Sequence, residues 1–240
     1  MREQKDYIPS ASVLLLRKRN EKIEVLLLKK NSKITFGGSW VFPGGRIDEE
    51  DNNGLYSDFS AERRAVTREC IEETGLEINS SSLEPISVWK TPATRPKRFS
   101  TVFFIYDARG LDQPIKIDHG EIVESQWGAI KEVLAQHDAK ELILAGPAYV
   151  TLSSIRSLSS IEEIWAYFRD EGFKEFTPRV QLNKNGAICL YKGDEGYDQL
   201  NDDSISDCEI LLEKIESASS RHRLYMSKAN SWKYVNNLSD

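Results

Sequence analysis

Apolar runs joined by charged turns predict a series of short strands in the first half of the chain. The runs at 10–18 and 23–30 are rich in Val, Ile and Leu, and the polar turn between them predicts a β-hairpin. Similar runs at 86–92 and 99–108 predict two more strands on either side of a basic loop, and 121–130 predicts a fifth.

Helical patterns lie between and after these strands. Residues 59–74 predict a helix, with Ser57 or Asp58 as its N-cap and Gly75 as the residue that ends it. The segment before it, 36–58, is dense in Gly, Pro, Asp and Asn, which is typical of a loop. Three more helical segments follow the last strand, at 130–138, 148–158 and 161–172. This alternation of strands and helices predicts an α/β fold.

The pattern changes after Thr177. Residues 179–191 contain a central Asn-Gly, and residues 221–235 have two β-leaning arms around a short polar turn, so each predicts a pair of strands. An acidic stretch connects the two pairs. We therefore predict an α/β domain over residues 1–176 and a β-rich C-terminal extension, packed on it, over residues 177–240.

Composition and charge narrow the classes of protein. The 240 residues are 40% hydrophobic and 29% charged, as in soluble globular proteins, and the net charge of −6 argues against a general nucleic-acid or anionic-membrane binder. The start has no apolar signal-peptide core, and no run approaches the ~18 apolar residues of a membrane span. The three cysteines, Cys70, Cys189 and Cys208, show neither disulfide nor zinc spacing. The expected compartment is the cytoplasm.

Three glutamates gather on the helix at 59–74. At ~100° per residue, Glu69, Glu72 and Glu73 fall within a sector of about 100°, so they share one face. Like charges three and four residues apart weaken a helix by a few tenths of a kcal/mol each, so helix stability gives no reason for this arrangement. The alternative is an ordinary acidic face paired with Lys or Arg. We favour the interpretation that these glutamates bind a cation that the sequence itself does not supply.

The residues around these glutamates resemble a known family. The stretches "GGRIDEED" and "RECIEETGL" are similar to the Nudix hydrolase signature Gly-x5-Glu-x7-Arg-Glu-U-x-Glu-Glu-x-Gly-U, where U is a bulky apolar residue. The second half matches nearly position by position, with Cys70 in place of the usual aliphatic residue. The matching residues are Arg68, Glu69, Glu72, Glu73, Gly75 and Leu76.

The first half departs from that signature. If Gly45 is the motif glycine, Asp51 stands at the expected glutamate, and sixteen residues rather than seven separate it from Arg68. We interpret Asn52 to about Asp58 as an insertion. This leaves the metal role of Asp51 open, and Glu50 could substitute for it.

The resemblance implies an α/β/α sandwich with a mixed central sheet, and a water that attacks a diphosphate bridge with the help of Mg²⁺ or Mn²⁺. It implies Glu69, Glu72, Glu73 and the Gly45 carbonyl as metal ligands, with Arg68 orienting a glutamate. The residue types support this assignment independently of the resemblance, because carboxylates are the ligands that Mg²⁺ prefers.

Several candidate residues lie outside the helix. Glu121 is our first choice for the catalytic base, ahead of Glu124 and His119, and Glu72 could serve either as a base or as a metal ligand. The alternative is that Glu121, Glu124 and His119 are solvated loop residues without a catalytic role. The basic side chains of the loop "TRPKRF" could bind the diphosphate, and Arg98 is the first candidate for that role. The alternative is that they are simply exposed on the surface. These loop cations are Arg95, Lys97 and Arg98.

Some aromatic and titratable side chains have simpler interpretations. Trp40, Trp89 and Trp127 could stack on a base, but large aromatic residues beside strands more often belong to the core or its rim. His137 and His222 show no partner in the sequence, so we expect them on the surface.

The substrate is the least determined feature. The layout over residues 8–170 looks like the large bacterial Nudix proteins related to the coenzyme A diphosphatase branch, although lysines stand where that branch has arginines. Coenzyme A or acyl-CoA is the first candidate, followed by ADP-ribose, NADH and nucleotide sugars. The rival class is a nucleotide-sensing module that cuts nothing. The C-terminal extension could form a homodimer, cover the substrate or dock a partner.

Overall fold

The computed structural model describes residues 7–33, 37–52, 58–93, 95–184, 186–200, 218–228 and 231–238. The chain divides into two compact units. The first, here the sheet–helix unit, comprises residues 9–88 and 101–174, and the second, the C-terminal unit, comprises residues 1–8, 89–100 and 175–240. The predicted boundary at residue 176 stays a prediction.

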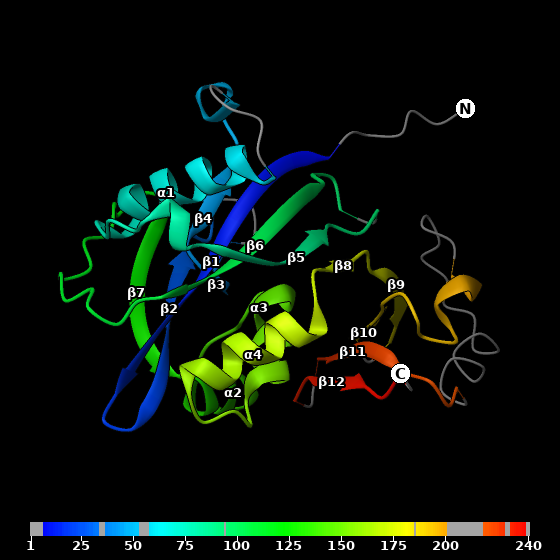
Figure 1. The fold of residues 1–240 in the computed structure, drawn as a ribbon. Helices are drawn as coiled ribbons and strands as arrows, with labels where there is room; N and C mark the ends of the chain where they lie inside the picture. Colours follow the sequence, from blue (N-terminus) through cyan, green and yellow to red (C-terminus); the bar gives the residue numbers. More distant parts are fainter. Residues whose placement is uncertain are drawn as a thin grey trace. The chain divides into compact units, whose positions relative to one another are not determined.

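The described strands and helices follow the sequence patterns closely (Figure 1). The strands are β1 (Ile8–Arg19), β2 (Lys22–Lys30), β3 (Trp40–Val41), β4 (Gly44–Arg46), β5 (Glu84–Lys90), β6 (Phe99–Asp107), β7 (Ile122–Ala129), β8 (Lys174–Phe176), β9 (Arg179–Asn183), β10 (Gly186–Leu190), β11 (His222–Ser227) and β12 (Lys233–Asn236). The α-helices are α1 (Ser60–Thr74), α2 (Ile130–Asp138), α3 (Gly146–Ile155) and α4 (Ile161–Glu171).

The predicted hairpin is formed by β1 and β2. Arg19 pairs with Lys22, and the two residues between them, Asn20 and Glu21, have φ angles of 47° and 60°. A two-residue turn with two positive φ angles matches the twist of antiparallel strands. The hairpin therefore fixes the register that carries Lys30 to the end of β2.

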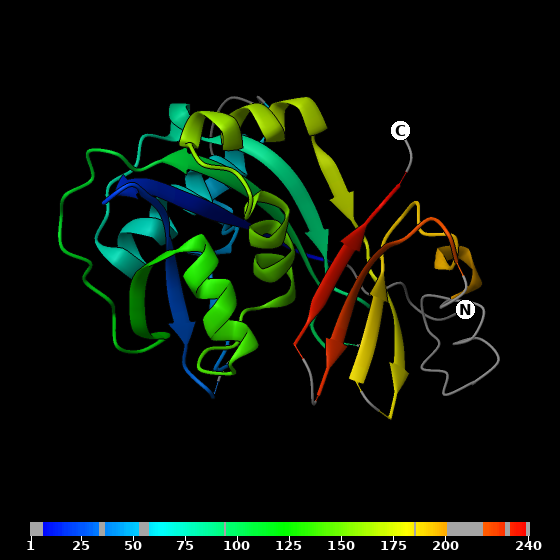
Figure 2. The same ribbon diagram turned by 90° about the horizontal axis from the view of Figure 1, so that it is seen from below.

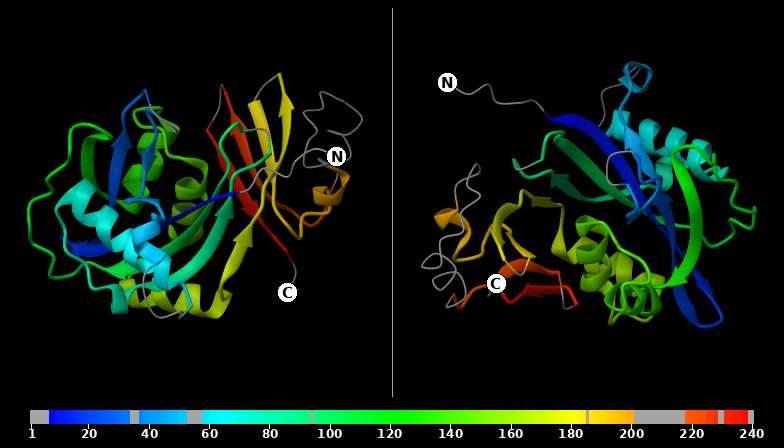
Figure 3. Two further views of the ribbon diagram at one scale, coloured as in Figure 1. Left: turned by 90° about the horizontal axis from the view of Figure 1, so that it is seen from above. Right: turned by 180° about the vertical axis from the view of Figure 1, so that it is seen from behind.

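The larger sheet has the order β3-β2-β1-β6-β5-β8, with β4 also paired to β1 and β7 also paired to β2. Helix α1 covers one face of this sheet (Figure 3), and α2, α3 and α4 lie on the other (Figure 2). Alternate residues of β1 point to the two faces. Val13 and Leu15 pack in the α1-side core, while Leu14 and Leu16 point the other way and are also fully buried.

Helix α1 begins and ends with left-handed residues. Gly75 has φ 70° and donates its N–H to the Ile71 carbonyl, so the predicted C-terminal stop is confirmed. The N-cap is Phe59, with φ 59° and no side-chain cap bond, so the prediction of Asp58 is wrong. The Phe59 ring packs edge-on against Phe104 in the core, which indicates that burial rather than capping fixes this end. Ser57, the other predicted cap, lies outside the described residues.

The C-terminal unit contains a separate antiparallel sheet of order β12-β11-β10-β9 (Figure 2). The Trp89 and Phe176 rings stack at 4.0 Å, and Tyr191 packs edge-on against both. A buried ion pair joins Arg223 to Asp194 at 2.7 Å. These contacts give the unit a core of its own.

The expected α/β class, with a mixed central sheet and a small β-rich C-terminal appendage, is confirmed. The short strands β3, β4 and β8 were missed, because two or three residues carry too little periodicity to show. No helix in the described part of the chain is long and apolar enough to cross a membrane.

Candidate active site

Helix α1 holds the three glutamates at different depths. Its apolar stripe, including the fully buried Val66 and Cys70, packs against the sheet, and this fixes the direction of the acidic face. The Glu73 side chain is 7% exposed and that of Glu69 16%, whereas that of Glu72 is 57% exposed. Two carboxylates are thus partly shielded from water, and one lies in solvent.

The glycine pair of β4 passes directly over the two shielded carboxylates. Gly44 donates its N–H to Glu73 Oε2 at 2.9 Å. A Cβ added at Gly45 would lie 2.1 Å from Glu69 Oε1, so that position has room only for glycine while Glu69 keeps its place. Because β4 pairs with β1, this approach is part of the sheet's register.

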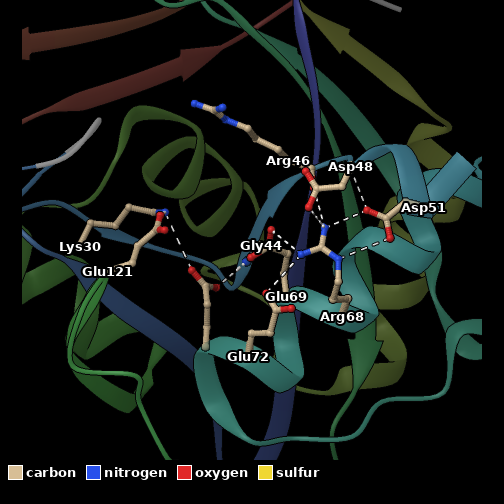
Figure 4. Close-up of polar contacts among 10 residues, drawn as sticks. Lys30, Gly44, Arg46, Asp48, Asp51, Arg68, Glu69, Glu72 and Glu121 are labelled. Carbon is tan, nitrogen blue, oxygen red and sulfur yellow. Dashed lines mark hydrogen bonds and ion pairs between the residues drawn. The ribbon is translucent and has the colours of Figure 1, made fainter.

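Arg68 connects the helix acids to the loop before the helix (Figure 4). Its Nη1 donates to Glu69 Oε1 at 3.1 Å and to Glu72 Oε2 at 3.2 Å, and its Nη2 donates to Asp51 Oδ2 at 2.8 Å. Nη2 also donates to the Arg46 carbonyl at 3.0 Å. One guanidinium therefore contacts two helix carboxylates and the loop aspartate at once.

Asp51, whose metal role the sequence leaves open, is buried and forms an ion pair with Arg68. It is 5% exposed, and its Oδ2 also accepts the Asp48 N–H at 2.9 Å. Burial would raise the pKa of Asp51, but the hydrogen bonds from Arg68 and Asp48 and the Arg68 charge hold it below the ordinary value. Glu50 is exposed on the adjoining 3₁₀ turn. The proposed insertion falls largely on residues 53–57, outside the described part of the chain.

A lysine that sequence reasoning missed completes the cluster. Lys30 Nζ forms an ion pair with Glu121 Oε1 and lies 3.9 Å from Glu73 Oε1. The Lys30 side chain is 13% exposed, and that of Glu121 is 54% exposed. The structure thus brings Glu121, our predicted base, beside the helix acids, as Figure 4 shows. The only signal in the sequence was a lysine ending a strand.

The clustered charges shift the pKa values of the shielded acids. Burial raises the pKa of Glu73 to about 8; Lys30 and the Gly44 N–H oppose this shift, and the charges of Glu69 and Glu121 add to it. Burial likewise raises the pKa of Glu69 in spite of Arg68, and the Glu72 and Glu121 charges raise it further. Additional positive charge here would stabilise the ionised forms.

The donor set fits a hard divalent cation. Carboxylate and carbonyl oxygens are what Mg²⁺ and Mn²⁺ prefer, and the mutual repulsion of Glu69, Glu73 and Glu121 is what such a cation offsets. In the residues that the structure describes, no three His, Cys, Asp or Glu side chains already surround one point as a metal site would have them. The side chains instead turn to Arg68, Lys30 and the β4 backbone.

The remaining predicted site residues lie elsewhere. Glu124 pairs with Lys29 at 2.6 Å, and His119 is an exposed loop residue with φ 58°. In the basic loop, Arg98 is half-buried with its Cζ 4.3 Å from the Tyr7 ring centre. Arg95 and Lys97 are exposed. All three cations of this loop belong to the C-terminal unit, and their binding of substrate stays a prediction.

His137 and His222 are buried, so their predicted surface position is wrong. His137 Nδ1 accepts the Leu144 N–H at 3.0 Å. His222 is 7% exposed, with one ring nitrogen 3.0 Å from the Tyr234 hydroxyl. Packing against other elements buries both rings, and the local sequence pattern around each histidine does not show that packing. Trp40 and Trp89 are 6% and 5% exposed, as their interpretation as core residues requires.

Comparisons with known proteins identify the fold and the family of the chain. A NUDIX hydrolase structure from Alicyclobacillus acidocaldarius is 20% identical over 68% of this chain and 97% of that one, with a TM-score of 0.59. The NUDIX domain of Shewanella oneidensis NrtR, complexed with ADP ribose, is 20% identical over 64% of this chain and 88% of that one, with a TM-score of 0.50. The family model for the NUDIX domain matches residues 6–145, more than half of the chain, which therefore belongs to the Nudix family.

Proposed function

We propose that this chain is a Mg²⁺- or Mn²⁺-dependent hydrolase that cuts the diphosphate linkage of a nucleoside diphosphate joined to another moiety. The observation that carries this proposal is the convergence of Glu69 and Glu73 beside the glycine pair of β4, with Glu121 joined to them through Lys30. A protein gains no stability from crowding half-shielded anions, so the cluster makes sense as a cation site.

In this proposal, Glu69, Glu72 and Glu73 hold the cation together with the Gly45 carbonyl. When bound, the cation would lower the pKa of a water and offset charge on the phosphate oxygens. The Gly44 N–H fixes the direction of the Glu73 carboxylate, and Arg68 does the same for Glu69 and Glu72.

Glu121 is the proposed base, sharing that duty with Glu72. Its carboxylate is more than half exposed, so a water can reach it, and a carboxylate beside the cluster can accept the proton that the attacking water loses. Lys30 forms an ion pair with this carboxylate and lies beside the acids of α1. Arg95, Lys97 and Arg98 remain the proposed phosphate-binding cations.

The proposed substrates share a nucleoside diphosphate. Coenzyme A and its acyl esters come first, on the layout of the sequence, and ADP-ribose, NADH and nucleotide sugars follow. The NrtR domain complexed with ADP ribose supports the place of ADP-ribose among the candidates. Hydrolysis of any of them yields a nucleoside monophosphate, or its positional equivalent, and a phosphorylated second product.

A mass-spectrometric product assay tests the proposal. Purified protein is incubated with Mg²⁺ or Mn²⁺ and each candidate substrate, with a nucleoside triphosphate included and with Glu73→Gln as the inactive control. We expect cleavage at the diphosphate of one substrate class, and no products from the variant or in EDTA. Equal turnover by Glu73→Gln would contradict the metal assignment.

The same experiment separates the enzyme from the sensing module. If no substrate is cut while one of them raises the melting temperature of the protein, the chain binds a nucleotide without hydrolysing it. The retained glutamates favour the enzyme, because a sensor has no need of them.

A further inference from the structure

The ion pair between Lys30 and Glu121 joins two elements that are distant in sequence and gives Glu121 its place. Glu121 immediately precedes β7, on a loop, and its side chain is 54% exposed. The negative charges of Glu69 and Glu73 repel its carboxylate. With repulsion on one side and open solvent on the other, its side chain would turn outwards unless something held it.

A β-bulge in the pairing of β2 with β7 places Lys30 near Glu121. Lys29 pairs with Glu124 and Lys30 with Ile122, so Val123 is an extra residue on β7 and the register shifts between the two lysines. Such bulges redirect side chains and are frequent beside active sites. Here the bulge brings Lys30 close to Glu121 while Lys29 remains opposite Glu124.

Hydrogen bonds from Asn31 and to Asp118 hold the backbone around Glu121 in place. Asn31 donates its N–H to the Glu121 carbonyl at 2.8 Å and its Nδ2 to the Gly120 carbonyl at 3.0 Å. Asp118 accepts the N–H groups of Glu121 and Ile122 at 2.8 and 2.9 Å. Two of these hydrogen bonds hold the main chain of Glu121 and two hold that of its neighbours, Gly120 and Ile122. Only the direction of the Glu121 side chain is left to be decided.

We infer that Lys30 is a positioning residue, which keeps the Glu121 carboxylate beside the acids of α1. The ammonium lies between Glu121 Oε1 and Glu73 Oε1, and it balances part of the negative charge that would otherwise drive Glu121 away. The inference deepens the proposed function, since it assigns a second residue to the presentation of the proposed base.

The chain offers a matched control one residue away. Lys29 lies on the same strand, pairs with Glu124 on the same neighbouring strand at 2.6 Å, and has no ion pair with an α1 glutamate among the described contacts. Lys29→Met and Lys30→Met remove the same charge and keep a similar volume, so any general effect of losing a lysine from β2 appears in both variants.

Crystal structures of the metal-free Lys30→Met and Lys29→Met proteins test the inference without reference to activity. We expect the Glu121 carboxylate to leave Glu73 in the first variant and to keep its place in the second. A Glu121 side chain that stays beside Glu73 without Lys30 overturns the inference, whatever the protein catalyses.

Kinetics provide the second test. With the substrate found in the product assay, we expect kcat to fall tenfold or more in Lys30→Met with KM changed less than threefold, to recover within threefold in Lys30→Arg, and to stay within twofold in Lys29→Met. In a Glu121→Gln background, Lys30→Met should add less than a twofold loss, because both changes act through one carboxylate. Multiplicative losses would show that Lys30 acts by itself and overturn the inference.

The outcomes separate the two proposals. A wild-type protein that cuts no candidate substrate, with Glu121 displaced in crystals of Lys30→Met, contradicts the proposed function and leaves the positioning role standing. An active wild type, with Glu121 in place without Lys30, does the reverse.

Discussion

Glu73→Gln should make the metal-free protein more stable while it removes activity. The pKa of Glu73 rises from an ordinary 4.5 to about 8, and one pKa unit corresponds to about 1.4 kcal/mol. Keeping this carboxylate ionised therefore costs the metal-free fold on the order of 5 kcal/mol. Glutamine has nearly the same volume and no charge, and its amide oxygen can still accept the Gly44 N–H.

The pH dependence follows from the direction of the shift. The unfolded chain releases the Glu73 proton near pH 4.5, whereas the folded chain holds it to about pH 8. Between these values the folded state binds more protons, so the free energy of unfolding falls as the pH rises. This contribution is fully present below pH 4.5 and is lost once the pH exceeds 8. Glu73→Gln lacks the dependence.

Denaturant unfolding in EDTA at pH 5.5, 7 and 9 measures the difference. We expect the free energy of unfolding of the variant to exceed that of the wild type by only about 1 kcal/mol at pH 5.5, one unit above the unfolded pKa. At pH 9 the excess should be about 2–5 kcal/mol, or several degrees in Tm. Glu72→Gln, at the more exposed position, is the matched control and should change the stability by less than about 1 kcal/mol. A variant that is less stable than the wild type at pH 9 would refute the reasoning, as would a difference that does not change with pH. Added Mg²⁺ should stabilise the wild type alone.

Three further variants test the surroundings of the acids. Gly44→Ala should cost ~3 kcal/mol or more in denaturant unfolding, because φ is +147° and the new Cβ would meet a β1 carbonyl oxygen at 2.2 Å. Gly45→Ala should keep its Tm within about 2 °C and lose at least tenfold in kcat, because the Cβ meets the movable Glu69 carboxylate; full activity would contradict the close approach. Asp51→Asn should lower the free energy of unfolding by ~1–3 kcal/mol at pH 7, because it removes the Arg68 ion pair. That difference should shrink in acid, since the pKa of Asp51 lies below 3.8 and its charge is lost as the pH falls through it; a constant difference would argue against the ion pair.

Local patterns were enough for most of the fold. The strands β1 and β2 were predicted from the periodicity of their apolar runs, and the pair β9 and β10 from an Asn-Gly in the sequence. Neighbouring residues alone decide both signals. The acidic face of α1 follows in the same way from helical spacing. Where the outcome depended on distant packing, prediction was poorer: Phe59 rather than Asp58 is the N-cap of α1, because its ring enters the core.

The sequence by itself therefore determined the fold class, the family resemblance and the three glutamates on one helix face, because each is written in residues close together along the chain. Only the tertiary structure decided what those glutamates meet. Asp51 reaches Arg68 across the proposed insertion, and Lys30 reaches Glu121 across 91 positions. Strand pairing and the β-bulge create that second contact, and a charge pair between elements so far apart leaves no periodic or compositional trace in one sequence.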